Sequence, residues 1–126
     1  MGKKSVQTEK APQAIGPYSQ GIKVGNTVYV SGQIAVDPAT GQIVSGGARE
    51  QTKQCMENIL AVLAAEGMTA EDIVKTTIYL KDLNNFDAVN EVYSSFFAKD
   101  YPARVCLQVA RLPKDVEVEI EAIAVK

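Results

Sequence analysis

The 126-residue sequence contains no histidine and no tryptophan, and it has only two cysteines. Without histidine, the chain cannot build a Ser-His-Asp or Cys-His nucleophile system, an imidazole-ligated zinc site or an imidazole proton relay. Cys55 and Cys106 fit no metal-ligand spacing and suggest no disulfide framework. Any chemistry must therefore use carboxylates, guanidinium groups, amines, hydroxyls, thiols or the backbone.

Long apolar runs and a strong charge of either sign are also missing. The longest uninterrupted apolar run, residues 59–65, is far too short to span a membrane, and the N-terminus has no apolar core of a secretory signal. The formal net charge is −2, and the first twelve residues carry three lysines and one glutamate, which leaves −4 on the rest. This acidic body is poorly suited to neutralising phosphates. We therefore expect a cytoplasmic protein with neither nucleic acid nor membrane as a partner.

The composition, 46% hydrophobic and 22% charged, is that of one globular domain covering residues 1–126. Residues 1–13 are polar and lysine-bearing, and we expect them to form a loose N-terminal lead-in. The chain has no internal repeat and no linker that would divide it. The patterning then predicts two hairpins (21–24 with 27–31, and 33–36 with 42–44), a helix over 48–66, a strand over 74–80, a helix that begins after Asn84 or Asn85, and strands over 103–109 and 116–125.

This order predicts an α+β fold with both helices on one face of a sheet, and helical crossovers that make their flanking strands parallel. We expect all three phenylalanines to lie in the second helix, where their spacing indicates core packing. In the last two strands, aliphatic residues alternate with Arg104, Cys106 and Gln108, and then with Glu117, Glu119 and Glu121. If the aliphatic faces pack on the helices, Arg104 and the glutamates share the opposite face.

Two interpretations of this polar face remain open. It is either solvated, as in many antiparallel sheets, or covered by another subunit. Cys106 and Ile123 are poor choices for open water, which favours coverage. An arginine in a partly covered site is suited to bidentate binding of a carboxylate or a phosphate.

Four motifs then give the sequence a close resemblance to a known family. They are Gly16-Pro17-Tyr18-Ser19-Gln20, Val30-Ser31-Gly32-Gln33, Pro102-Ala103-Arg104-Val105-Cys106 and the closing Arg111-Leu112-Pro113-Lys114-Asp115 with Glu119-Ile120-Glu121-Ala122. Over residues 8–126 the chain resembles the Rid family (RidA/YjgF), in the subgroup of 2-iminobutanoate/2-iminopropanoate deaminases.

The resemblance implies a chorismate-mutase-like mixed sheet with two helices packed on one face, in which the last strand inserts between earlier ones. It implies a homotrimer with clefts between subunits, and no cofactor or metal. The implied activity is hydrolytic deamination of reactive enamines and imines, such as 2-aminoacrylate, 2-iminopropanoate and 2-iminobutanoate, to 2-oxo acids and ammonia. Such an enzyme protects pyridoxal-phosphate enzymes from these intermediates.

The resemblance also implies roles for individual residues. Arg104 would bind the substrate carboxylate, and Glu119 would act on the attacking water, either as a base or only by orienting it. The remaining pocket positions are Tyr18, as a catalytic assistant, and Ser31, Gly32 and Cys106, as substrate-binding positions. Each has a structural alternative: an interface role for Tyr18, a backbone hydrogen bond for Ser31, close approach of ligand or chain for Gly32, and packing or a nucleophilic thiol for Cys106.

Two other functions stay open at this point. The same cleft would serve a non-enzymatic regulatory trimer that binds small carboxylates, and some members of the family are reported as ribonucleases or translation inhibitors. The acidic body and the lack of histidine argue against the latter.

Overall fold

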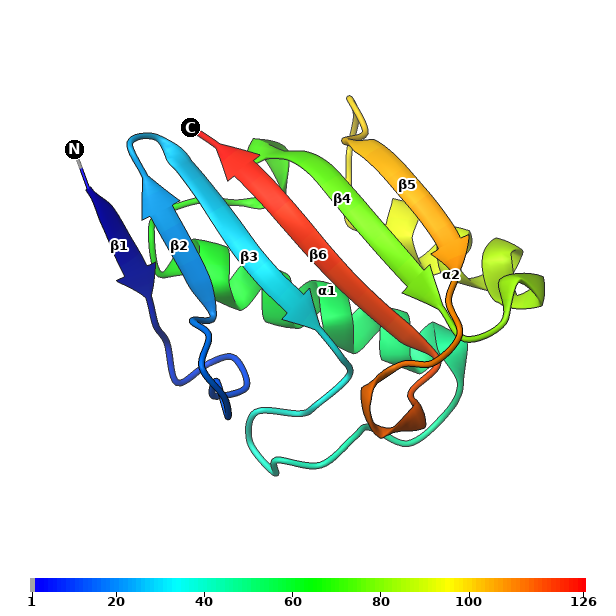
Figure 1. The fold of residues 1–126 in the computed structure, drawn as a ribbon. Helices are drawn as coiled ribbons and strands as arrows, with labels where there is room; N and C mark the ends of the chain where they lie inside the picture. Colours follow the sequence, from blue (N-terminus) through cyan, green and yellow to red (C-terminus); the bar gives the residue numbers. More distant parts are fainter. Residues whose placement is uncertain (1) are drawn as a thin grey trace.

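The computed structural model describes residues 2–126, in which six strands form one mixed sheet and two α-helices pack on one of its faces (Figure 1). The strands are β1 (Lys3–Val6), β2 (Gly21–Val24), β3 (Thr27–Gln33), β4 (Ile73–Leu80), β5 (Ala103–Gln108) and β6 (Val118–Val125). The helices are α1 (Ala48–Ala64) and α2 (Phe86–Ser94). This arrangement confirms the predicted α+β class. Within residues 2–126, neither helix is long and apolar enough to cross a membrane.

The sheet order is β1-β2-β3-β6-β4-β5, so the last strand lies between β3 and β4. β4 and β5 are parallel, while the other neighbours are antiparallel. The insertion of β6 that the family resemblance implied is therefore confirmed, and no hairpin joins β5 to β6. The parallel pair on either side of α2 follows from the predicted crossover.

α1 forms because its apolar positions recur at helical spacing and its N-terminus is capped. The Glu50 carboxylate accepts a hydrogen bond from the backbone N–H of Gly47 at 2.9 Å, which satisfies one of the N–H groups that a helix start leaves unpaired. Beyond the helix the chain turns at Gly67, whose φ of +71° favours glycine. The buried stripe of α1 packs against β3 and β6 to form the core, with Met56, Ile59, Leu63, Ile78 and Ile120 among its largest fully buried side chains.

The expectation of a loose lead-in over residues 1–13 is wrong for Lys3–Val6, which pairs with β2 as an edge strand. Val6 is 2% exposed and belongs to the core. The ammonium groups of Lys4 and Lys23 lie 3.1 and 3.3 Å from the Glu66 carboxylate, which joins β1 and β2 to the end of the α1 region. The segment Lys3–Val6 is therefore held in the sheet by one buried side chain and this ion-pair cluster, although its composition alone indicates a loop.

The second predicted hairpin is also different. Gln33 ends β3, and residues 34–44 form a loop with a single bridge between Val36 and Ile43. The buried Asn58 of α1 donates hydrogen bonds to the backbone carbonyls of Ile34 and Val36, at 3.2 and 3.0 Å. These two carbonyls therefore bind the helix, and the loop follows α1 instead of extending the sheet.

Candidate active site

The structure places Arg104 on the face of the sheet that the helices cover. Arg104 pairs with Thr76, and Thr76 pairs with Ala122; both partners are buried in the core face. Glu119 pairs with Tyr79, which lies three positions after Thr76 in β4. Because side chains alternate between the two faces of a strand, Tyr79 and Glu119 lie on the face opposite to Thr76. The prediction that Arg104 and the glutamates share a face is wrong.

The physical reason lies in β5, which is the edge strand beside the short helix α2. Val105 and Leu107 point to the uncovered face, where they are 46% and 38% exposed. Aliphatic alternation identifies two faces of a strand, but it does not say which face the helices cover when both faces carry apolar residues. The surface of α2 that faces β5 carries aromatic rings and a side-chain amide, and a guanidinium group packs favourably against such a surface.

Three residues of α2 hold Arg104. Its Nη1 donates a hydrogen bond of 2.6 Å to Oδ1 of Asn90, and its guanidinium carbon lies 5.2 and 5.6 Å from the ring centroids of Tyr93 and Phe86. The Tyr93 hydroxyl is in turn hydrogen-bonded to Oγ1 of Thr76 at 2.7 Å. Cation–π contacts and a neutral amide thus orient the charge. Phe86, predicted to be core, is 37% exposed and serves as one wall of this cradle.

The cradle leaves Arg104 able to bind an anion. Among residues 2–126, no carboxylate forms an ion pair with its guanidinium. Arg104 lines an open cavity of about 550 Å³ together with residues of α2 and Tyr101-Pro102. A planar guanidinium without a carboxylate partner, beside a cavity, is suited to bidentate binding of a substrate carboxylate.

Cys106 lies on the same face, where it is half-buried and packs against the core. Burial raises the pKa of its thiol above the ordinary value, and nearby Arg104 only partly offsets this effect. The thiol therefore stays protonated at neutral pH. This favours packing or a backbone contact over the nucleophilic alternative.

Glu119 and Gly32 meet on the uncovered side of the sheet. β3 has a bulge between Val30 and Gln33, so Ser31 and Gly32 together oppose one position of β6. The Glu119 carboxylate lies directly over Gly32, and a Cβ at position 32 would overlap Oε2 and come within 3.0 Å of Cδ. The sequence left open that Gly32 permits the close approach of a ligand or of another part of the chain, and the structure shows that the Glu119 side chain makes such an approach.

The environment of Glu119 changes its acidity. Burial, followed by the negative charge of Glu121, raises the pKa of the Glu119 carboxyl above its ordinary value. Glu121 in turn accepts a hydrogen bond of 2.8 Å from the Tyr79 hydroxyl. A carboxylate with a raised pKa is a stronger base, which suits Glu119 to activating water.

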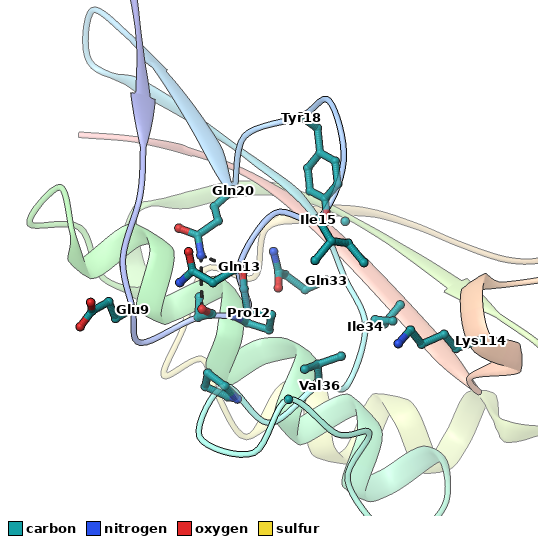
Figure 2. A pocket seen from close by; sticks show the side chains of 14 residues that line it. Glu9, Pro12, Gln13, Ile15, Tyr18, Gln20, Gln33, Ile34, Val36 and Lys114 are labelled. Carbon is teal, nitrogen blue, oxygen red and sulfur yellow. Dashed lines mark hydrogen bonds between the residues drawn. The ribbon is translucent and has the colours of Figure 1, made fainter.

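Ser31 and Tyr18 lie beside Gly32. Oγ of Ser31 donates a 2.6 Å hydrogen bond to the carbonyl of Ser19, which is the backbone bond considered from the sequence. This bond fixes the turn that carries Tyr18, which is 52% exposed. Tyr18 and Gly32 line one cavity of about 300 Å³, and Figure 2 shows Tyr18 and Ile15 at one side of it.

The predicted site residues therefore fall into two groups. Tyr18, Ser31, Gly32 and Glu119 lie together near the bulge of β3, whereas Arg104 and Cys106 lie under α2 on the opposite face. Sequence reasoning missed Asn90, which contacts Arg104 directly. Its signal was a polar residue four positions after Phe86 and three before Tyr93, on the same stripe of the helix.

Comparison with known proteins identifies the family. Residues 8–126 match the family described as Endoribonuclease L-PSP, which is the YjgF/RidA family. The chain belongs to the RidA/YjgF family.

Individual RidA/YjgF members are similar over almost their whole length. A RutC family protein of Pyrococcus abyssi is 58% identical over 100% of this chain and 99% of that protein. The human 2-iminobutanoate/2-iminopropanoate deaminase is 50% identical over 96% of this chain and 88% of its own length. The crystal structure of E. coli TdcF with bound serine has a TM-score of 0.94 at 49% identity and covers 98% of both chains. RidA/YjgF relatives thus carry several functional names, and membership alone does not specify the reaction.

Proposed function

We propose that this RidA/YjgF protein, a single domain over residues 1–126, is a cytoplasmic deaminase. It hydrolyses the enamine 2-aminoacrylate and the imines 2-iminopropanoate and 2-iminobutanoate to 2-oxo acids and ammonia, without a cofactor. The human relative named as such a deaminase supports this assignment. The structural observation that carries it is Arg104, a guanidinium held by Asn90, Tyr93 and Phe86 and available to a carboxylate.

The reaction needs few protein groups. The imine carbon is conjugated to a carboxylate and is already electrophilic, so a fixed water can add to it. Arg104 binds the substrate carboxylate, and Glu119 accepts a proton as water forms the new C–O bond. The proton then passes to nitrogen, with the Tyr18 hydroxyl assisting. A second proton moves from the new hydroxyl group to the nitrogen as the C–N bond breaks, so ammonia leaves and the hydroxyl carbon becomes the carbonyl of the 2-oxo acid. General-base assistance of this kind contributes roughly 10²–10⁴-fold in rate.

A homotrimer with clefts between subunits is part of the proposal. Arg104 and Glu119 lie on opposite faces of one sheet, so a small substrate cannot contact both within a single chain. A cleft formed by Arg104 of one subunit and Glu119 of the next would contain both. The exposure of Tyr29, Val105 and Leu107 on the face without helices supports coverage of that face by another subunit.

A coupled assay tests the function. An amino-acid oxidase generates imines from alanine and from 2-aminobutyrate, semicarbazide traps them, and the protein must compete with the trap by releasing the 2-oxo acid. We expect wild type to compete and Arg104→Ala to fail. Arg104→Lys should recover little, because a point charge does not reproduce the planar two-bond contact.

Two other measurements, of carboxylate binding and of RNA cleavage, could contradict the proposal. Tight binding of small carboxylates without turnover would identify the non-enzymatic regulatory trimer. RNA cleavage that survives extensive purification and disappears in Arg104→Ala would identify a ribonuclease.

A further inference from the structure

We propose that Gln20 is a positioning residue for the reaction: its buried side chain closes the loop of residues 12–20 and so holds Tyr18, the catalytic assistant, in place. This inference rests on the proposed deaminase function and adds a residue to its machinery. The side chain of Gln20 is only 3% exposed. A buried amide needs hydrogen-bond partners, and the identity of these partners shows what the residue holds together.

The partners of the Gln20 amide all lie in one short segment, residues 8–12. Its nitrogen donates to the carbonyls of Thr8, Ala11 and Pro12, at 3.0, 3.3 and 2.7 Å (Figure 2). Its oxygen accepts from the backbone N–H of Thr8 at 2.7 Å. The shortest of the three donated bonds joins Gln20 to Pro12, so this side chain ties the two ends of the loop of residues 12–20 together.

The position of Tyr18 depends on the closure of this loop. Tyr18 lies on the loop, and because its side chain is 52% exposed, the loop backbone rather than packing on the core sets its position. The Tyr18 N–H donates to the carbonyl of Gly16 at 2.8 Å, which makes a tight turn just before the ring. A surface loop whose ends are tied is compact. Without the tie, the turn that carries Tyr18 is free to move away from the site.

The backbone of Gln20 fixes the same loop to the other reacting group. Its carbonyl accepts a hydrogen bond from the N–H of Ser31 at 2.9 Å. Ser31 precedes Gly32, over which the carboxylate of Glu119 lies. The side chain of Gln20 thus closes the loop, and its main chain joins the closed loop to the bulge of β3. Tyr18 is therefore held at a fixed position relative to Glu119.

A double-mutant cycle distinguishes positioning from a merely structural role. The coupled oxidase assay with the alanine imine gives kcat and KM. Gln20→Leu removes all four hydrogen bonds and should lower kcat about a hundredfold, as misplacement of a reacting group by about 1 Å does. KM should stay within about twofold, because Arg104 still binds the carboxylate. Tyr18→Phe should lower kcat at least as much. In the Tyr18→Phe background, Gln20→Leu should cost less than about twofold, since the hydroxyl is already absent.

Two further variants complete the cycle. Gln13→Ala is the matched control: Gln13 is exposed and also donates to the Thr8 carbonyl, at 3.3 Å, but it does not tie the ends of the loop. It should keep the wild-type kcat. Gln20→Asn covers the case in which Gln20→Leu does not fold, because it keeps a buried amide that is one methylene too short to reach every partner. We expect a smaller fall in kcat, again only where Tyr18 is intact.

The remaining outcomes separate this inference from the function on which it rests. Equal fold-losses of kcat in both backgrounds, or a wild-type kcat in a folded Gln20 variant, would overturn the positioning role and leave the deaminase function standing. A wild-type kcat in Tyr18→Phe would overturn it as well, because Gln20 would then have no catalytic group to position. A wild type that hydrolyses no imine would refute the function itself.

Discussion

Gly32 and Glu119 depend on each other, because the carboxylate occupies the space that any side chain at position 32 would fill. Gly32→Ala should displace the carboxylate and reduce kcat by about a hundredfold, as misplacement of a reacting group by about 1 Å does. The unfolding midpoint should change little, since a flexible carboxylate can swing aside. Gly47→Ala is the control, because nothing lies within 4 Å of its Cβ position, and it should keep full turnover. Normal turnover in Gly32→Ala would show that the position of the Glu119 carboxylate over Gly32 does not matter for catalysis.

The pH dependence of kcat/KM tests the role of Glu119 as a base. Burial and the charge of Glu121 raise the pKa of the Glu119 carboxyl, so the acidic limb of the profile should lie at higher pH than the ordinary pKa of a glutamate would place it. Glu121→Gln removes the neighbouring charge and should lower this pKa, which moves the limb to lower pH. Tyr79→Phe removes the hydroxyl bonded to Glu121 but keeps the charge, and should move the limb much less. A limb that does not respond to Glu121→Gln would show that Glu119 only orients water.

The burial of one side chain of β1 predicts that this strand contributes to the free energy of unfolding of the domain. Val6 is 2% exposed, and Val6→Ala should lower the free energy of unfolding by about 2 kcal/mol, through lost burial and the remaining cavity. Lys3→Ala in the same strand alters an exposed side chain and should change it by less than about 0.5 kcal/mol. Denaturant titration measures both variants. Equal, small effects would mean that β1 is a loose lead-in after all.

The sequence predicts long periodic elements better than short ones. The helix in α1 and the strand in β4 follow from clear periods over many residues, and family resemblance supplies the central position of β6. β1 was not predicted because its four residues contain one buried side chain and its ion pair, between Lys4 and Glu66, joins segments that are distant in the sequence. The prediction of which face of β5 packs on the helices was wrong because Val105 and Leu107, on the uncovered face, are as apolar as residues that pack on a helix. Only the position of α2 shows that Arg104 belongs on the covered side.

For the whole molecule, the uncovered face of the sheet should be the surface of assembly. Leu107→Lys places a charge on this face and should reduce the mass measured by light scattering below that of a trimer at micromolar concentration. Glu57→Lys changes an exposed charge on α1 and should leave the mass unchanged. A wild type that is a stable monomer would refute the shared cleft, and a trimer unaffected by Leu107→Lys would exclude this face as its contact surface.

If one active site uses Arg104 of one subunit and Glu119 of another, mixing the subunits of two inactive variants should restore activity. Arg104→Ala and Glu119→Gln homotrimers should each be nearly inactive in the imine assay. When the two are unfolded together and refolded as mixed trimers, about a quarter of the clefts regain both native groups by random assembly. We therefore expect the mixed trimers to recover about a quarter of wild-type activity. Mixed trimers that remain as inactive as the two parents would contradict it.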